Sequence, residues 1–508
     1  MRTLKSESSN LNSNQMLTQG AVEAAPDEEL QVANSKSLYT RDTTPPYIAG
    51  YLKYAAFRIP TLLADKAYIY TFAQGRFETH EDFGGEQHIL FRRSKDRGKT
   101  WESMQTIAKG KKGFACGSMS PVLLGENKLL LMWVEQHLDN ASPTQIYTTR
   151  SNDGGKSWSE PKNVTNEVKR SNVGQGTWFG VGPSSGIVKK HVSHQGRILI
   201  VASQSGVTIR DEDYAFSPSH LVYSDDGGES WSVGATMSVK SKEATLVELM
   251  DGNLLVNARN NDLQHRVVGV SRDGGYTFAV DGNQLRENPE EGKNAGKILT
   301  DCPMGGSDCG VHSGLLVHPE KNPNTGLSRL VFSSPQGIDF ERTIAVLQLS
   351  ENGGKSWSKQ VRYSDDAQSP DDVPGYAGYS NLVSLDGGKN IGVIFERGGT
   401  VRKKYLEGKA LIENATWQIK FNTFDSEGLV CPLKSEQGMT KREEKALKCR
   451  DKVAQRRHHM IDFKIIPYAA FYDRKIAASV EEPKGDKILK CVNMDSSIGK
   501  ISPQGICE

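Results

Sequence analysis

The stretch SNDGGKSW, from Ser151 to Trp158, decides the fold because close copies of it recur along the chain. They share the pattern Ser-x-Asp-x-Gly-x-Thr/Ser-Trp, with Phe278 replacing Trp once and Asn352 replacing Asp once. Five copies indicate a repeat architecture, in which each repeat is one supersecondary unit. The other four copies are SKDRGKTW (94–101), SDDGGESW (224–231), SRDGGYTF (271–278) and SENGGKSW (350–357).

The residue types of this box suit a tight hairpin turn. The Asp carboxylate can accept hydrogen bonds from backbone amides two residues on, Gly tolerates a positive φ, and the aromatic ring can pack under the turn. Short β-branched or aromatic runs lead into the boxes, such as QIYTTRS (145–151) and HLVYSDD (220–226). Each box is therefore predicted to lie on one hairpin and to have a structural rather than a catalytic role.

The spacing of the boxes predicts the architecture. Successive copies begin 47 to 79 residues apart, which leaves room for about four short strands in each repeat. Four-stranded sheets repeated radially form a β-propeller. The hairpins from Tyr379 to about Phe424 carry no box and are expected to add one more blade. We expect an all-β propeller over residues 46–425, a disordered N-terminal arm over 1–45, and a short, partly helical C-terminal extension over 426–508.

Composition narrows the function classes. Of 508 residues, 63 are Lys or Arg and 61 are Asp or Glu, so no basic excess points to nucleic acid or to an anionic membrane. No run of about 18 apolar residues predicts a transmembrane helix. The N-terminus lacks the apolar core of a secretory signal, so we expect either a cytosolic protein or one whose signal lies outside this sequence.

The seven cysteines do not predict a metal site. Cys302 and Cys309 could clip one loop, but with His312 they fit no standard zinc spacing. Four cysteines fall in the last 80 or so residues, where a disulfide-stapled appendage is possible, although the odd total argues against it. No metal is expected, and the disulfide pattern stays open.

A tetrad upstream of the boxes, Phe57-Arg58-Ile59-Pro60, carries the functional signal. A Phe/Tyr-Arg-Ile-Pro tetrad ahead of a series of Asp boxes resembles the exo-α-sialidase superfamily, and the chain looks most similar to the lysosomal-type animal sialidases. The resemblance covers roughly residues 50–420 and implies a six-bladed propeller that hydrolyses terminal sialic acid without a cofactor. Further matching stretches follow in the same order: TFAQGR (71–76), GPSSGI (182–187), LLVNARN (254–260), PGYAGYSNL (374–382) and VIFERGG (393–399).

The resemblance implies a triad of arginines, Arg58, Arg259 and Arg342, that binds the carboxylate of sialic acid. Planar guanidinium groups bind carboxylates bidentately and keep their charge at any working pH. In an empty site three such groups would repel one another, so the triad is expected to serve binding rather than stability. Glu396 matches the acid that braces the tetrad arginine, and Arg76 matches the residue that reaches the hydroxyl side of the sugar ring.

The expected nucleophile is a tyrosine. Because the anomeric carbon of sialic acid already bears a carboxylate, an anionic nucleophile would be repelled, whereas a neutral phenol is not. Tyr379 matches the family position, and Tyr376 is the rival three residues away. A phenol needs a base beside it. Glu243 matches that glutamate, and Glu248, nearer the following turn, is the alternative.

The expected general acid is Asp82, in the loop that follows Arg76. Its distance of six residues from Arg76 matches the spacing in the family. The neighbouring Glu81 and His80 could do the same chemistry. The family's Gly-Pro-Gly-x-Gly loop reads Gly-Pro-Ser-Ser-Gly at 182–186 in this chain. Because of the Gly-to-Ser change, we leave this loop out of the predicted site.

These residues predict a retaining exo-α-sialidase that acts through a tyrosyl-enzyme intermediate on sialylated glycoproteins, glycolipids or oligosaccharides, in ganglioside or oligosaccharide catabolism. A lysosomal or membrane-associated location follows from the resemblance alone. The alternatives are a trans-sialidase, an enzyme for deaminated sialic acid, a non-catalytic sialic-acid-binding propeller, and a purely structural Asp-box propeller. All three catalytic positions are filled, which favours the enzyme.

Overall fold

The computed structural model describes residues 44–426 with gaps, together with 490–492 and 498–500, and all of these belong to one compact unit. Most of the predicted N-terminal arm and nearly all of the predicted C-terminal extension, including its helical part, lie outside the described residues. The gaps within 44–426 are 49–50, 79–81, 83–84, 111–112, 139–143, 170–177, 192, 206–207, 210–211, 214–217, 238–240, 260–265, 279–310, 336–344, 358, 363–376, 398–401, 407–408 and 414–417.

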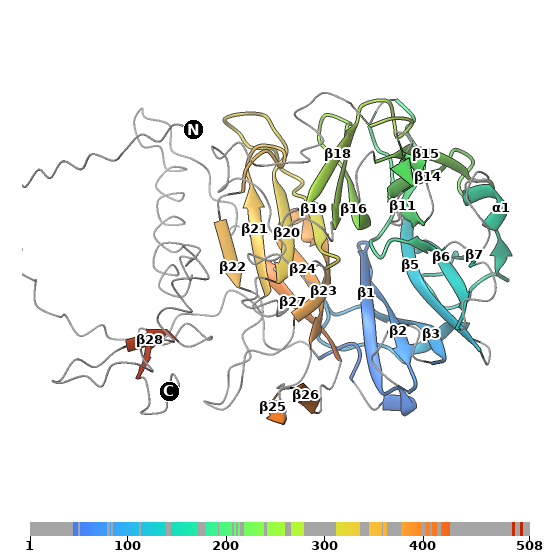
Figure 1. Cartoon of the computed structure of the whole chain (residues 1–508). Helices are drawn as coiled ribbons and strands as arrows, with labels where there is room; N and C mark the ends of the chain where they lie inside the picture. Colours follow the sequence, from blue (N-terminus) through green and yellow to red (C-terminus); the bar gives the residue numbers. More distant parts are fainter. Residues whose placement is uncertain are drawn as a thin grey trace, which may run out of the picture. The chain divides into compact units, whose positions relative to one another are not determined.

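The described chain consists almost entirely of β-strands that pair antiparallel with their neighbours in sequence (Figure 1). The first eight strands form one sheet made of two antiparallel groups, which a single parallel bridge between Gln87 and Ala115 joins. The first group contains β1 (Ala56–Ala64), β2 (Ile69–Arg76), β3 (Gln87–Ser94) and β4 (Gln105–Lys109). The second contains β5 (Phe114–Gly125), β6 (Lys128–His137), β7 (Gln145–Ser151) and β8 (Lys162–Asn163).

Four more sheets follow in chain order. The third group contains β9 (Phe179–Val181), β10 (Ile187–Val188), β11 (Ile198–Gln204), β14 (Ser219–Ser224) and β15 (Ser232–Thr236). The fourth contains β16 (Lys242–Glu248), β17 (Leu254–Arg259) and β18 (Val267–Ser271). The fifth contains β19 (Gly314–Val317), β20 (Leu330–Pro335), β21 (Ala345–Ser350) and β22 (Lys359–Arg362), and the sixth contains β23 (Ala377–Leu385), β24 (Asn390–Arg397) and β27 (Gln418–Asp425).

The remaining elements are short, and none of the described helices is long or apolar enough to cross a membrane. Three further pairs of strands are β12 (Thr208–Ile209) with β13 (Glu212–Asp213), β25 (Arg402–Leu406) with β26 (Lys409–Glu413), and β28 (Lys490–Val492) with β29 (Ile498–Lys500). The helices are α1 (Thr165–Val168) and the 3-10 turns η1 (Tyr51–Lys53) and η2 (Asp386–Gly388).

The hydrophobic core lies between consecutive sheets. Each cluster of buried apolar side chains in the described residues draws mainly on two neighbouring groups, and one cluster joins the sixth group to the first. Strands such as β2, β17 and β21 are buried at every position, because a neighbouring sheet covers each of their faces. This explains why the sequence reads as continuous apolar runs rather than as alternating ones.

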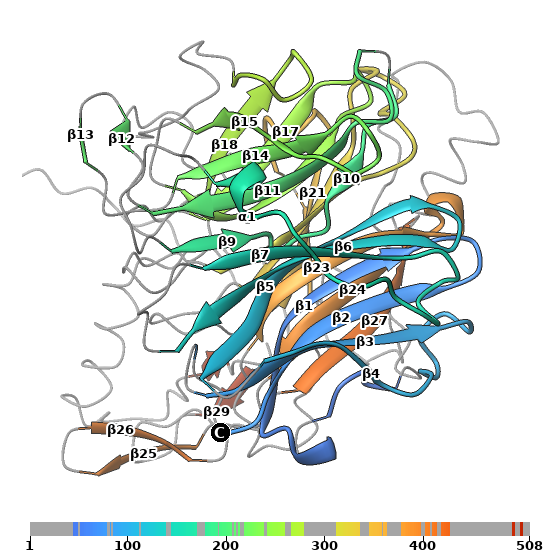
Figure 2. The ribbon, with the colours of Figure 1, turned by 90° about the vertical axis from the view of Figure 1, so that its right-hand side faces the viewer.

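The innermost strands contact one another: β1 contacts β5 and β23, and β19 contacts β16 and β23. Figure 2 shows β1, β5 and β23 side by side. The start of the described chain completes this arrangement. Tyr47 is fully buried and bridges antiparallel to Ile419 of β27, so the chain's beginning is added to its last sheet. Thr44, which the sequence assigned to the N-terminal arm, hydrogen bonds to Lys99 in the first Asp box.

Four of the Asp boxes join two paired strands, which are β3 with β4, β7 with β8, β14 with β15, and β21 with β22. In the box from Ser151 to Trp158, the Asp153 carboxylate accepts hydrogen bonds from the amides of Lys156 at 2.9 Å and Ser157 at 3.0 Å. These amides lie three and four residues on, not two as expected. The strand registers place Ser94 opposite Ile69 and Gln87 opposite Arg76, so the first box lies at the far end of its sheet from Arg76.

The second glycine of a box packs directly against the preceding sheet. Gly155 has a φ of 83°, and a Cβ added there would lie 2.3 Å from the ring of Phe91 on β3. Gly227, in the next box, has a similar φ of 75° but no atom within 4 Å of an added Cβ. The two positions therefore separate the effect of backbone strain from the effect of packing.

We predict that Gly155→Ala destabilises the protein by roughly 2–5 kcal/mol, because left-handed strain of about 1–2 kcal/mol adds to overpacking of about 1–3 kcal/mol. Gly227→Ala should show only the strain. Denaturant unfolding of both variants measures the difference. Equal losses would mean that the box glycine does not set the spacing between sheets.

Candidate active site

The predicted site residues converge at one end of the sheets because of how the hairpins are paired. In three groups, the start of the inner strand lies beside the end of the second strand, with Ala56 opposite Arg76, Lys242 opposite Arg259, and Ala377 opposite Arg397. The same end of β1 carries Arg58, that of β16 carries Glu243, and that of β23 carries Tyr379. Side chains from distant parts of the sequence thereby face one cavity of about 250 Å³.

A bulge interrupts each of these inner strands next to its functional residue. The register shifts fall between Arg58 and Thr61, between Lys242 and Ala244, and between Ala377 and Ser380. Bulges break the alternation of a strand and re-aim a side chain. Two residues at these bulges have left-handed backbone angles, with a φ of 56° at Ile59 and 46° at Glu243.

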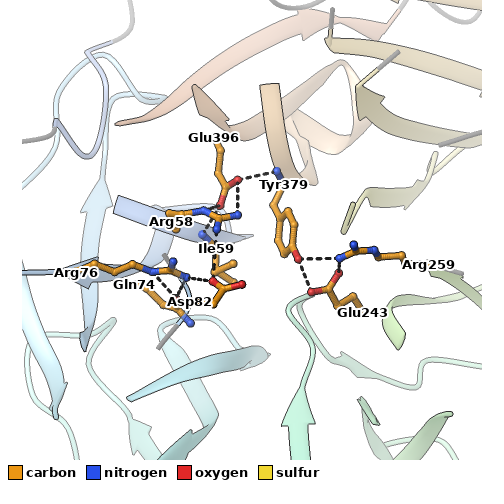
Figure 3. A network of polar contacts seen from close by, with 9 residues as sticks. All are labelled: Arg58, Ile59, Gln74, Arg76, Asp82, Glu243, Arg259, Tyr379 and Glu396. Atoms are coloured by element: carbon orange, nitrogen blue, oxygen red, sulfur yellow. Dashed lines mark hydrogen bonds and ion pairs between the residues drawn. The ribbon is translucent and has the colours of Figure 1, made fainter. Parts of the chain in front are cut away.

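Glu396 holds the first part of the site together (Figure 3). Its carboxylate is fully buried and accepts hydrogen bonds from Arg58 Nε at 3.1 Å and Arg58 Nη2 at 3.3 Å. It also accepts from the amide of Ile59 at 2.8 Å and the amide of Tyr379 at 3.1 Å. A buried carboxylate needs such complete pairing, because an unpaired one would be strongly destabilising. The contacts match the bracing role that the sequence predicted for Glu396.

Arg76 lies beside this cluster and contacts the predicted acid. Its Nη2 donates to Gln74 Oε1 at 2.7 Å and to Asp82 Oδ1 at 2.6 Å. Arg58 Nη1 lies 3.4 Å from the same Asp82 oxygen. The side chain of Asp82 is 60% exposed and lines the cavity, whereas the two arginines are buried.

The charges around Asp82 decide its protonation. Loss of hydration favours its neutral form, but the positive charges of Arg76 and Arg58 outweigh that effect, and the pKa of Asp82 lies below its ordinary value. Asp82 is therefore a carboxylate when the site is empty. Glu81 and His80, the alternatives for its role, lie outside the described residues.

Tyr379, Glu243 and Arg259 form the second part of the site. The phenol Oη of Tyr379 donates a short hydrogen bond to Glu243 Oε1. Arg259 Nη1 donates to Glu243 Oε2 at 2.6 Å and to the phenol oxygen at 3.3 Å. The guanidinium of Arg58 lies 5.5 Å from the centre of the Tyr379 ring, so arginines flank this tyrosine on two sides.

The pKa of Glu243 suits a group that stays ionised. Burial alone would raise it, yet the charge of Arg259 and the hydrogen bond from Tyr379 lower the pKa of Glu243 to about 2. Glu248, the alternative base, lies at the other end of β16. It pairs there with the buried Lys189 at 2.8 Å and accepts from the amide of Lys190, so it has a structural role.

Two members of the expected arginine triad, Arg58 and Arg259, lie on either side of Tyr379. The third, Arg342, lies outside the described residues, as does Tyr376, the rival nucleophile. Each of the three arginines described in this site is paired with a carboxylate, so part of its charge is balanced in the empty site. The pairs are Arg58 with Glu396, Arg76 with Asp82, and Arg259 with Glu243.

The sequence reasoning was wrong to leave out the loop at 182–186, because Gly182 and Pro183 line the cavity. It also missed several polar or aromatic wall residues. Some of these had a signal in the sequence, since Gln74 lies two residues before Arg76 on one strand and therefore shares its face. The missed residues are Gln74, Gln87, Ser118, Gln136, Trp178, Ser203 and Lys242. Among the described residues, no three His, Cys, Asp or Glu side chains gather closely enough to hold a metal ion.

Comparisons with known proteins agree with this geometry. Residues 68–391 match the family described as a BNR repeat-like domain, and this is more than half of the chain. The chain belongs to this family. A sialidase of Bacteroides fragilis is 26% identical over 367 residues, which cover 67% of this chain and 60% of that protein. Bovine Sialidase-3 is 25% identical over 385 residues, which cover 67% of this chain and 86% of that protein.

A solved structure of a leech intramolecular trans-sialidase, complexed with 2,7-anhydro-Neu5Ac, has a TM-score of 0.58 and is 15% identical. The match covers 76% of this chain and 71% of that one, and it shows a shared fold. Together, the family match and these relatives place the BNR repeat-like chain in the exo-α-sialidase superfamily. The chain spans about three fifths of the length of the Bacteroides relative.

The lowered pKa of Glu243 makes a prediction about stability and pH. Its ordinary pKa is 4.5, so the ion pair stabilises the folded state fully above that pH and is lost as the pH falls toward 2. Between pH 5 and pH 2.5, wild type should lose roughly 2–3 kcal/mol more stability than Glu243→Gln. Urea unfolding at a series of pH values measures this, and Glu160→Gln, on the exposed surface, should follow wild type. Parallel curves for wild type and Glu243→Gln would contradict the assignment.

Proposed function

We propose that this protein is a retaining exo-α-sialidase with a six-bladed propeller, which releases terminal sialic acid through a tyrosyl-enzyme intermediate. One observation carries the proposal. The phenol of Tyr379 is hydrogen-bonded to an ionised glutamate and flanked by two arginines at a cavity wall. Such a phenol has a base and a cationic environment, which together make it a nucleophile suited to an anionic sugar.

The arginines are suited to bind the carboxylate of the sugar. Arg58 and Arg259 approach Tyr379 from different sides, so a carboxylate that contacts both would place its attached anomeric carbon near the phenol oxygen. Arg342 is the proposed third contact. Lys242 also lines the cavity and adds a cationic side chain to its wall. Cationic side chains at a cavity wall favour an anionic ligand.

In the first step, the Tyr379 oxygen attacks the anomeric carbon while the bond to the leaving oxygen breaks. The phenol proton passes to Glu243 along the existing hydrogen bond. Glu243 is a weak base, with a pKa of about 2, but the phenol becomes far more acidic as its oxygen forms the new bond. Positive charge that develops on the sugar ring is stabilised by the carboxylates of the site.

Asp82 supplies the proton to the leaving oxygen in this scheme. In the empty site, Arg76 and Arg58 keep it ionised. A bound substrate carboxylate neutralises part of this positive charge, which raises the pKa of Asp82 and lets it carry a proton. In the second step, water attacks the anomeric carbon as the bond from that carbon to the Tyr379 oxygen breaks. Asp82 takes a proton from the water, and the released phenol oxygen recovers its own proton from Glu243.

A second outcome of the same intermediate is an intramolecular trans-sialidase reaction, in which a hydroxyl of the bound sugar replaces water. The likeness to the leech structure, which holds 2,7-anhydro-Neu5Ac, favours this as the second candidate. The first step is common to both reactions. Identification of the released sugar by mass spectrometry distinguishes them, because the anhydro product is lighter by one water.

The core clusters support the six-bladed part of the proposal. Each of the six antiparallel groups shares a cluster with the next group, and Tyr47 ties the last group to the first. Each group would be one blade, and the blade formed by β23, β24 and β27 is the one without a box.

The identity of the nucleophile can be tested with 2,3-difluorosialic acid, whose fluorine at C3 slows breakdown of the intermediate. We expect labelling of wild type on a peptide that contains Tyr379, and no labelling of Tyr379→Phe. The kcat of Tyr379→Phe on a fluorogenic sialoside should fall by roughly three orders of magnitude or more, with sialic-acid affinity largely kept. Tyr376→Phe is the matched control. If the label is on Tyr376, or if wild type releases no sugar from pH 4 to 7, the proposal fails.

The role of Asp82 can be tested by varying the leaving group. An acid matters most when the leaving oxygen is basic, so Asp82→Ala should slow glycosylation by sialyllactose about 10²–10⁴-fold and by a nitrophenyl sialoside far less. Pre-steady-state release of the leaving group measures this step separately. Glu81→Ala should behave like wild type on both substrates. Equal losses for Asp82→Ala would mean that Asp82 positions the loop rather than donating a proton.

A further inference from the structure

His312 is a buried histidine that the scheme above does not use. It lies two residues before β19 and has no exposed surface. Among the described residues, neither of its ring nitrogens makes a well-formed hydrogen bond. Buried polar groups without partners are rare in folded proteins, so such a group needs an explanation.

The surroundings of His312 supply one. Its ring lies 5.9 Å from the ring of Tyr379, tilted by 55°. The backbone of Glu243 lies on another side, close enough to favour the charged form of the imidazole. The His312 side chain therefore lies next to both Tyr379 and Glu243, the proposed nucleophile and its base.

The charges around His312 keep it neutral. Burial is the largest effect, and the positive charge of Arg266 acts in the same direction, as does that of Arg259. Glu243 opposes them, but the pKa of His312 still lies at about 3. Arg266 is itself fixed by Asn257 Oδ1 at 2.6 Å and the carbonyl of Val311 at 2.6 Å. A neutral ring does not compete with the phenol of Tyr379 for the negative charge of Glu243.

The backbone of Glu243 needs such support. Its φ of 46° is in the left-handed region, which costs a residue with a side chain about 1–2 kcal/mol. This conformation lies in the bulge between Lys242 and Ala244, and the bulge turns the carboxylate toward Tyr379. Strained backbone of this kind persists only where the surrounding structure holds it in place.

We propose that His312 is a positioning residue. Its imidazole packs on the Tyr379 ring and holds the strained backbone of Glu243, which keeps the phenol hydrogen-bonded to the carboxylate. The proposal rests on the proposed function, since it names a support for the nucleophile of that reaction. It predicts that His312 acts mainly on the chemical step, because its contacts are with the phenol and its base, whereas Arg58 is held by Glu396.

The test compares His312→Phe with a matched control. Phe keeps a ring against Tyr379 but cannot interact polarly with the Glu243 backbone. We expect kcat on a fluorogenic sialoside and the rate of labelling by 2,3-difluorosialic acid to fall about 10- to 100-fold, with KM within about twofold of wild type. The matched control is His318, which is also buried but lies just after the other end of β19, away from Tyr379 and Glu243. His318→Phe should leave kcat unchanged.

Further variants keep the test decisive if His312→Phe does not fold. His312→Asn and His312→Gln place an amide at the level of one or the other ring nitrogen, and we expect one of them to restore most of kcat. An unchanged kcat in folded His312→Phe would overturn the proposal, as would equal losses of kcat in His312→Phe and His318→Phe. Failure of both amide variants to recover kcat would also overturn it. If wild type itself is inactive, the proposed function fails instead.

Discussion

The buried carboxylate of Glu396 is the interaction on which the site depends. It lies on β24, yet it accepts hydrogen bonds from Arg58 and Ile59 on β1 and from the backbone of Tyr379 on β23. Arg58 and Glu396 are 338 residues apart in the sequence, so this ion pair also ties the first sheet to the last. An unpaired buried carboxylate would be strongly unfavourable. The positions of the proposed binding arginine and of the proposed nucleophile are therefore coupled to pairing between the first and the last sheet.

The rest of the site follows from one repeated geometry. Antiparallel hairpins bring the start of each inner strand beside the end of the next, and bulges at that end re-aim the side chains. The Asp-box turns lie at the opposite end of the strands, away from the cavity, where glycines such as Gly155 pack against a neighbouring strand. Stability and chemistry are thus separated along the strands, and each buried arginine of the site is balanced by a carboxylate.

The sequence predicted the repeat and the strands around it, because the boxes are local patterns. The resemblance supplied the expected site residues, and the structure brings those drawn in Figure 3 close together. The sequence could not predict what depends on pairing between distant strands. Lys242 and Gly182 line the cavity because of how strands far apart in the sequence are arranged. Only the ion pair between Glu248 and Lys189 indicates a structural role for Glu248. His312 was considered only as a poor metal ligand, because nothing near it in the sequence indicates that it packs on Tyr379. Arg342 and Asp82's neighbours remain predictions.

The central claim is that Tyr379 attacks the anomeric carbon and that a second attack then releases the sugar. Two inversions at one carbon give net retention, whereas direct attack by water gives inversion. Proton NMR of the first sialic acid released from an α-sialoside, recorded before mutarotation, is the most direct measurement. If Tyr379 is the nucleophile, the α-anomer, or the anhydro sugar of an intramolecular reaction, forms first. Initial release of the β-anomer would contradict it.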